Sequence, residues 1–176
     1  MVSATLVAQA VTVSRAGDAV TVRAPGFTFI KGEPLARLRD GRSVRVELEF
    51  AVLPKPGASG VTRNKQTFVL SYDLWEERFA VSLVGPPSRS TAYLTSSAAE
   101  AWCIDQVTMS VAAMGALGRD QPFWLRLEYT VLDNSRTSGQ DDSGFTLRGM
   151  IDALSGRRRI DEPRQRLEAG PFRLPN

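Results

Sequence analysis

Residues 43–53 read SVRVELEFAVL, with apolar side chains at every second position and charged side chains at three of the positions between them. Successive side chains of a β-strand point to opposite faces, so an alternation of this kind places one face in a core and the other in water. The stretch therefore predicts a half-buried antiparallel strand. We take it as the centre of the fold.

The same alternation recurs along the chain, in residues 6–13, 19–23, 67–73, 79–83 and 123–131. Gly17 lies where the first two of these segments reverse, and glycine accepts the positive φ that a tight hairpin turn requires. Pro54 ends the central segment, because proline cannot donate to a strand ladder. The chain thus predicts a mainly β fold: an antiparallel β-sandwich, immunoglobulin-like or C2-like in character, with roughly seven or eight strands.

Two segments have helical spacing instead. Ser97 and Glu100 have the spacing of a capping box, in which the serine accepts from a helix amide and the glutamate reaches back to the cap. Apolar residues follow at three- and four-residue intervals, so we expect one amphipathic helix that ends near Gly115 or Gly118 and packs on the sheet. Residues 147–154 predict a short second helix near the C-terminus.

The chain has 176 residues, the length of one domain. We expect a single β-rich domain over residues 1–176, with a core of about residues 4–156 and a basic tail at 157–176. Hydrophobic residues make up 43% and charged residues 23%, which is typical of a folded globular protein. The formal net charge of +3 is small and dispersed, which argues against nucleic acid as a partner.

Histidine is absent and cysteine occurs once. A Ser-His-Asp triad, a Cys-His pair and a His-ligated zinc site are therefore excluded within this chain. We interpret Cys103 as a small buried apolar residue, the alternative being a reactive thiol. Glu47 and Glu49 share a strand face and could act as an acid–base pair. Arg45 lies on that face too, which favours solvation and cross-strand pairing, so we expect no catalytic residues, no enzyme activity and no cofactor.

Two charged segments are candidate binding sites. Asp141 and Asp142 could contact calcium, but a calcium site needs about six oxygen ligands, so we expect a solvated loop and no metal site. Arg157, Arg158 and Arg159 follow the predicted C-terminal helix, where arginines complement the helix dipole. The alternative is an anionic contact, with a lipid headgroup surface or an acidic partner.

No stretch approaches the roughly 18 continuous apolar residues of a membrane span. The N-terminus lacks a charged region followed by an apolar core, so we expect no signal peptide in this chain.

Several segments together carry a family resemblance. Residues 47–50 (ELEF), 69–74 (VLSYDL) and 78–81 (RFAV) precede a helix-forming segment and a strand at 123–132. In this order they resemble a bacterial family of exported proteins, the domain of unknown function numbered 4390, over about residues 44–132. The segments MIDAL (150–154) and GPFRL (170–174) resemble relatives of the same group. The resemblance implies a periplasmic or exported location, with no known enzymatic activity and no site residues.

Two functions remain open. The first is a non-enzymatic binding or scaffold module of the bacterial cell envelope, which contacts a protein partner through a sheet edge or end loops. The alternative is binding of a lipid or amphiphile, or contact with a membrane surface, with the ligand held between sheet and helix. The aromatic residues expected to face the core motivate this alternative, although ordinary packing explains them too. They are Phe27, Phe50, Phe68, Tyr72 and Phe123.

Overall fold

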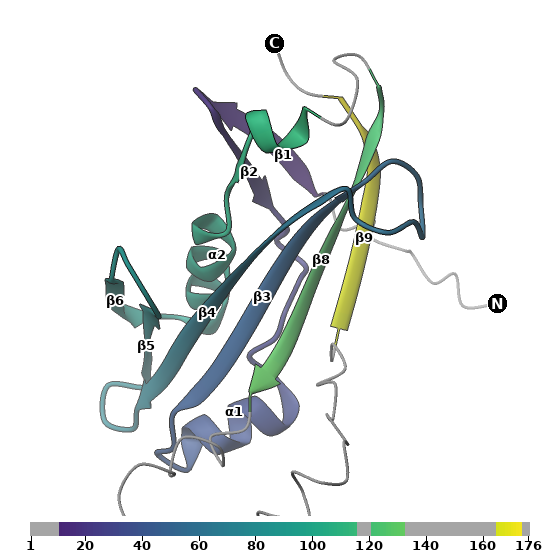
Figure 1. Cartoon of the computed structure of the whole chain (residues 1–176). Coiled ribbons are helices and arrows are strands. Elements are labelled where there is room, and N and C mark those ends of the chain that lie inside the picture. The colour runs from purple at the N-terminus through teal and green to yellow at the C-terminus, as the bar shows by residue number, and fades with distance from the viewer. Residues whose placement is uncertain (1–10, 116–120, 133–164, 174–176) are drawn as a thin grey trace, which may run out of the picture.

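The computed structural model describes residues 11–115, 121–132 and 165–173, and shows two antiparallel sheets (Figure 1). The larger sheet has the spatial order β6 (Arg89–Leu94), β5 (Arg78–Leu83), β4 (Thr62–Asp73), β3 (Val44–Leu53), β8 (Phe123–Leu132) and β9 (Gln165–Phe172). The smaller sheet has the order β1 (Thr12–Ala16), β2 (Ala19–Arg23) and β7 (Met109–Ser110). The helices are α1 (Gly32–Arg39), α2 (Ser96–Gln106) and the short 3-10 turn η1 (Ala112–Met114). The predicted mainly β, sandwich-like antiparallel fold is confirmed.

Strand β3 is central, as predicted. It pairs along nearly its whole length with β4 on one side and β8 on the other. Val46, Leu48 and Phe50 are buried on its inner face, whereas Glu47 and Glu49 lie half-buried on the outer face. The two-residue alternation in the sequence therefore reports the two faces of the sheet directly.

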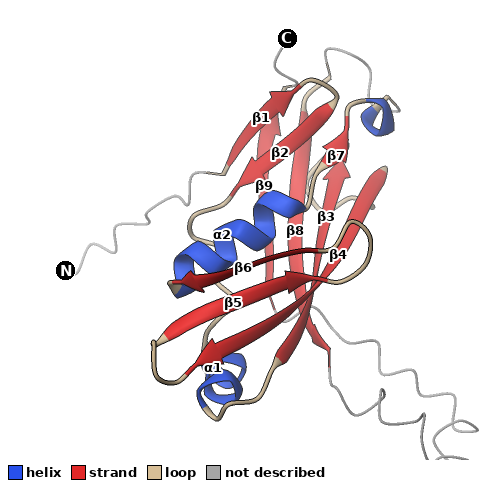
Figure 2. Cartoon of the chain, turned by 90° about the vertical axis from the view of Figure 1, so that its left-hand side faces the viewer, coloured by secondary structure: helices blue, strands red, loops and turns tan. Residues whose placement is uncertain are grey.

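The inner face of the large sheet is covered by a second layer, made of the small sheet and α2. Figure 2 shows both lying on the same side of the long strands. Val22 of β2 and the adjacent Ala24 line a small pocket of about 10 Å³ together with Phe50 of β3 and Leu125 of β8, so the small sheet packs closely on the large one there. The predicted hairpin between β1 and β2 turns at Gly17, whose φ is +60°.

A segment without regular structure, residues 24–31, runs from β2 to α1 across the inner face of the large sheet. Its Phe27 and Phe29 are buried. Both rings pack on Tyr129 of β8, with ring centroids 5.9 and 5.7 Å apart respectively. Aromatic pairs at such distances add stability beyond the area that they bury, so this cluster fixes the path of the segment.

Helix α2 is shorter than predicted. It ends at Gln106, and the expected extension to Gly115 or Gly118 is wrong. Beyond Val107 the chain becomes extended and forms β7, in which Met109 pairs with Val20 of β2. The apolar residues after the helix are buried by this strand and η1, and β-branched side chains such as Val107 and Thr108 favour the extended conformation.

The outer face of the large sheet carries ion pairs between neighbouring strands. Lys65 Nζ of β4 lies 2.7 Å from Glu47 Oε1 and 3.3 Å from Glu49 Oε2 of β3. The Glu47 hydrogen bond raises the pKa of Lys65, with smaller contributions from the Glu47 and Glu49 charges against a lowering by burial. Both glutamates thus make the cross-strand pairing that the shared face with Arg45 led us to expect.

Part of the predicted basic tail belongs to the sheet, because residues 165–172 form the edge strand β9. Arg126 Nη2 of β8 lies 2.7 Å from Glu168 Oε1. The same strands hold the loop between β3 and β4: Gly57 N donates to Glu168 Oε2 and Arg126 Nη2 donates to the Ala58 carbonyl, each at 3.0 Å. The predicted helix at 147–154, the aspartates 141–142 and the arginines 157–159 lie outside the described residues.

We expect Leu48→Ala to lower the free energy of unfolding by about 2–5 kcal/mol, because it opens a cavity in a fully buried site of the central strand. Ser71→Ala, on the exposed face of β4, is the control and should change it by less than about 0.5 kcal/mol. Urea unfolding followed by circular dichroism measures both. Equal effects of the two substitutions would contradict the central position of β3.

Candidate binding pocket beside helix α2

A pocket of about 560 Å³ lies between α2 and the end of the small sheet. One wall is a face of α2, formed by Ser97, Glu100, Ala101, Ile104 and Asp105. The opposite wall is formed by β1, β2 and the start of the segment that leads to α1, with Thr12, Arg23, Ala24, Pro25, Phe27 and Thr28. Pockets that take small molecules span about 300–1,000 Å³, so this one has the size of a ligand site.

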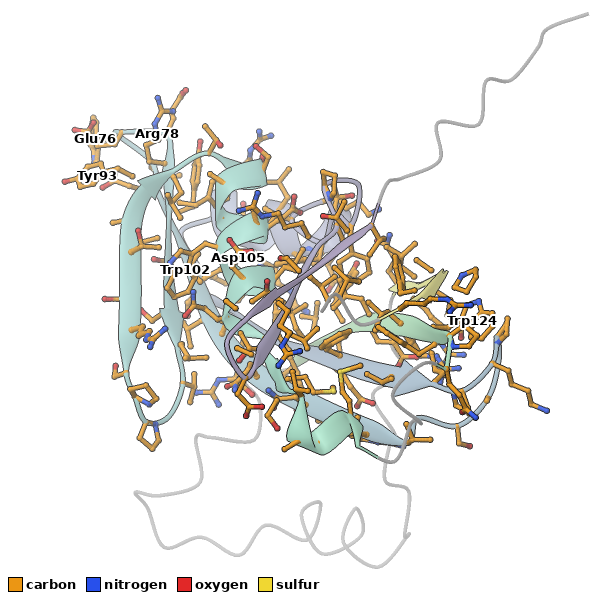
Figure 3. All side chains as sticks on the ribbon, turned by 90° about the horizontal axis from the view of Figure 1, so that it is seen from above. Glu76, Arg78, Tyr93, Trp102, Asp105 and Trp124 are labelled. Carbon is orange, nitrogen blue, oxygen red and sulfur yellow. The ribbon has the colours of Figure 1, made fainter. Side chains whose placement is uncertain are left out.

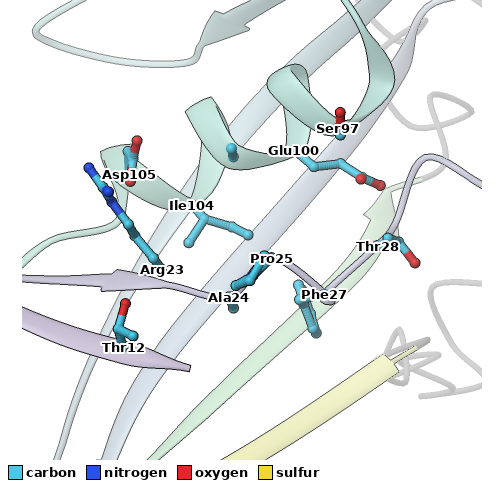
Figure 4. A pocket seen from close by; sticks show the side chains of 11 residues that line it. Thr12, Arg23, Ala24, Pro25, Phe27, Thr28, Ser97, Glu100, Ile104 and Asp105 are labelled. Atoms are coloured by element: carbon cyan, nitrogen blue, oxygen red, sulfur yellow. The ribbon is translucent and has the colours of Figure 1, made fainter. Parts of the chain in front are cut away.

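The pocket is apolar in the middle and polar at both ends (Figure 4). Ala24, Pro25 and Ile104 lie at its centre. Arg23 and Asp105 lie at one end, while Glu100 points toward the other. An apolar body with polar groups at its ends therefore matches the distribution of side chains.

Glu100 has an unusual setting for a carboxylate. Its side chain is only 6% exposed, and Oε1 accepts hydrogen bonds from the backbone amides of Phe29 and Ile30, each at 2.6 Å. The carboxylate thus fastens α2 to residues that lie about 70 positions earlier in the chain. Two amide donors on one oxygen satisfy part of the hydrogen-bonding capacity that burial removes from water.

The capping box predicted for Ser97 and Glu100 is wrong. The N-cap is Thr95, whose Oγ1 accepts from the Ala98 amide at 3.3 Å. Glu100 is instead on the buried side of α2 with Ala99, Cys103 and Ile104. The buried amides of the incoming segment compete for its carboxylate and take it away from the helix terminus.

Burial raises the pKa of Glu100 above its usual value. The amide hydrogen bonds from Ile30 and Phe29 act in the opposite direction, as does the positive charge of Lys31, but desolvation dominates. The ionised form is therefore disfavoured relative to water and would be stabilised by a positive charge brought into the pocket.

Cys103 lies one turn after Glu100 and is fully buried. Burial, together with the nearby Glu100 carboxylate, raises the pKa of its thiol far above the usual range. A thiol that stays protonated is a poor nucleophile, so the interpretation of Cys103 as a buried apolar residue is confirmed.

Most of the aromatic residues that were expected to face the core are packed within it. Of these five residues, only Phe27 lines the pocket. Phe50, Phe68 and Phe123 are fully buried in the core, and Tyr72 packs at a tilt against Phe79 with centroids 4.8 Å apart. The sequence analysis did not predict Glu100 as a pocket residue. Its spacing of three and four residues from Cys103 and Ile104 places it on the buried face of α2, and this spacing was a usable signal.

A second surface feature lies at the turn between β4 and β5 and on the neighbouring strand β6. Leu74, Trp75 and Tyr93, which we call the hairpin-tip cluster, are 56%, 95% and 75% exposed. Figure 3 shows Tyr93 at the same corner of the molecule as Glu76 and Arg78. Asp73 Oδ1 holds the turn by accepting from the amides of Trp75 and Glu76, at 2.8 and 3.0 Å.

In the described part of the chain, no group of three or more potential ligands could hold a metal ion. No helix among those residues is long and apolar enough to cross a membrane. Comparison of the chain with models of known families, with curated proteins and with solved structures gave no match.

Glu100→Ala should lower the free energy of unfolding by about 1–3 kcal/mol, because the buried amides of Phe29 and Ile30 lose their acceptor. Glu100→Gln keeps a carbonyl acceptor and should be at least as stable as the native chain at neutral pH, since it removes a buried charge. Urea unfolding of the three proteins checks the order, and a Gln variant as unstable as the Ala variant would contradict it.

The pH dependence of the same pair tests the raised pKa. The native state binds the Glu100 proton more tightly than the unfolded chain does, so the native protein should gain stability relative to Glu100→Gln as the pH falls through the folded pKa toward about 4.3. Above the folded pKa that contribution is lost. A difference between the two unfolding free energies that does not vary from neutral pH to about 4 would count against the desolvated carboxylate.

Proposed function

We propose that the protein is a non-enzymatic binding module that holds a small apolar or amphiphilic molecule in the pocket beside α2. The observation that carries the proposal is the pocket of about 560 Å³, which has an apolar middle and a nearly buried carboxylate at one end. A concave apolar site with a few polar groups is the usual form of a small-molecule site.

A ligand in this pocket would be held between a sheet and the helix, the arrangement expected for the amphiphile site, and the sheet concerned is the small one. The opposite side of α2 packs toward the large sheet, where Trp102 contacts Phe68 with centroids 6.2 Å apart. We propose a periplasmic or exported location on the strength of the family resemblance alone.

Filling the pocket tests this function. Ala101 lines the pocket, whereas Ala98 is an exposed alanine of the same helix outside it. We expect Ala101→Trp to weaken saturable binding of the neutral fluorescent amphiphile N-phenyl-1-naphthylamine by about tenfold or more, since the indole occupies the ligand volume. Ala98→Trp is the matched control and should bind like the native protein.

Fluorescence titration measures both variants, and circular dichroism checks that each is folded. The proposal fails if the native protein shows no saturable binding, or if Ala101→Trp and Ala98→Trp bind the probe equally well.

A second candidate function is contact with a protein partner through the edge of the large sheet. Strand β6 is an edge strand among the described residues, and the hairpin-tip cluster lies at this side of the sheet. Exposed edge strands pair with extended segments of other chains, and exposed aromatic residues are enriched where proteins meet.

Cross-linking in an envelope extract tests the second candidate. We expect cross-links from residues 73–78 and 89–94 to one protein species, and their loss in the double variant Trp75→Ser with Tyr93→Ser, because the exposed aromatic contact area is removed. Val61→Ser, which removes an exposed apolar residue elsewhere, is the control. Cross-links that are unaffected by the double variant would rule out this surface.

A further inference from the structure

We propose that the pocket selects an apolar molecule that carries a protonated primary amine, with the ammonium group bound to Glu100 Oε2. This inference rests on the proposed function and names the ligand class. Glu100 is the group that makes the choice, and the apolar middle of the pocket holds the hydrocarbon body.

The hydrogen bonds of Glu100 leave one oxygen free for a ligand. Oε1 is used by the amides of Phe29 and Ile30, while Oε2 has no hydrogen-bond partner among the described residues. Glu100 is only 6% exposed, yet it lines the pocket. The carboxylate is therefore already fixed in place. It holds little water that an incoming donor would have to displace.

The charges around the pocket favour a cation. Among the lining side chains Glu100 and Asp105 are acidic and Arg23 is basic, which gives a formal charge of −1. Arg23 and Asp105 both lie at the end away from Glu100, where their formal charges sum to zero (Figure 4). Lys31 influences Glu100 only through its charge, and no ion pair between the two is present among the described residues. Glu100 is thus the charged side chain that lines this end of the pocket, and Lys31 does not line it.

An amine fits this end better than other polar heads do. A primary ammonium has three donors and a full positive charge, and ion pairs gain strength where water is excluded. An alcohol supplies one donor without charge. A carboxylate head would bring a second anion next to Glu100, which is unfavourable.

The walls next to Glu100 set the remainder of the ligand. Ala24, Pro25, Phe27 and Ile104 present apolar surface between the two polar ends. A linear hydrocarbon that extends from the amine along these side chains buries its surface without placing a polar atom against them. Long-chain primary amines are the simplest molecules with this form.

Calorimetric titration with n-decylamine, n-decanol and decanoate, each below its aggregation concentration, tests the inference. For the native protein we expect decylamine to bind about tenfold or more tightly than decanol, and decanoate to bind most weakly. Glu100→Gln should weaken decylamine about tenfold or more and leave decanol within about threefold. Glu76→Gln, the same substitution at an exposed glutamate of the β4–β5 turn outside the pocket, is the matched control and should change each affinity by less than about threefold.

Decyltrimethylammonium provides a measurement on the native protein alone, which holds even if Glu100→Gln does not fold. It has the same charge and chain but no N–H donor, so it should bind more weakly than decylamine. Decylamine binding no tighter than decanol or decyltrimethylammonium would overturn the amine assignment and leave the proposed function standing. If none of the four probes binds, the amine assignment is overturned as well, and the naphthylamine titration decides separately whether the proposed function stands.

Discussion

The structure depends on one constraint, the two-sided pairing of β3. Because β4 and β8 both pair with it antiparallel along nearly its whole length, the parity of its side chains sets the inner and outer faces of three neighbouring strands. A shift of one residue would bring Glu47 and Glu49 into the core and expose Leu48. The apolar inner face then has to be covered by a second layer. Two different elements form that layer, the small sheet and helix α2. The pocket lies where the small sheet and α2 meet, because these two elements do not fill the space between them.

Glu100 joins α2 to the segment that follows the small sheet. Its carboxylate receives the amides of Phe29 and Ile30, while Phe27 and Phe29 pack on Tyr129 of the large sheet. The segment from 24 to 31 is therefore held by apolar contacts on one side and by a buried polar contact on the other. This arrangement fixes one wall of the pocket against α2, and a preformed wall lowers the ordering entropy that the protein must lose when a ligand binds.

Much of the large sheet could be read from the sequence, and the pocket could not. The alternations at 43–53, 67–73, 79–83 and 123–131 predict β3, β4, β5 and β8, since side-chain parity is a local property. The end of α2 was missed because the apolar spacing continues past Gln106, where pairing with β2 overrides helical propensity. Glu100 was assigned to a local cap because its true partners are about 70 residues away. Contacts of that length depend on how the layers meet, which local patterns do not encode.

The burial of the Cys103 thiol determines how the folded protein responds to oxidising conditions. Cys103 is the one cysteine of the sequence, it is buried on the core-facing side of α2, and the pKa of its thiol is raised. Disulfide exchange requires an accessible thiolate, so enzymes that oxidise thiols have nothing to engage while the fold is intact. Transfer between a reducing and an oxidising compartment would then leave the covalent structure of the folded protein unchanged.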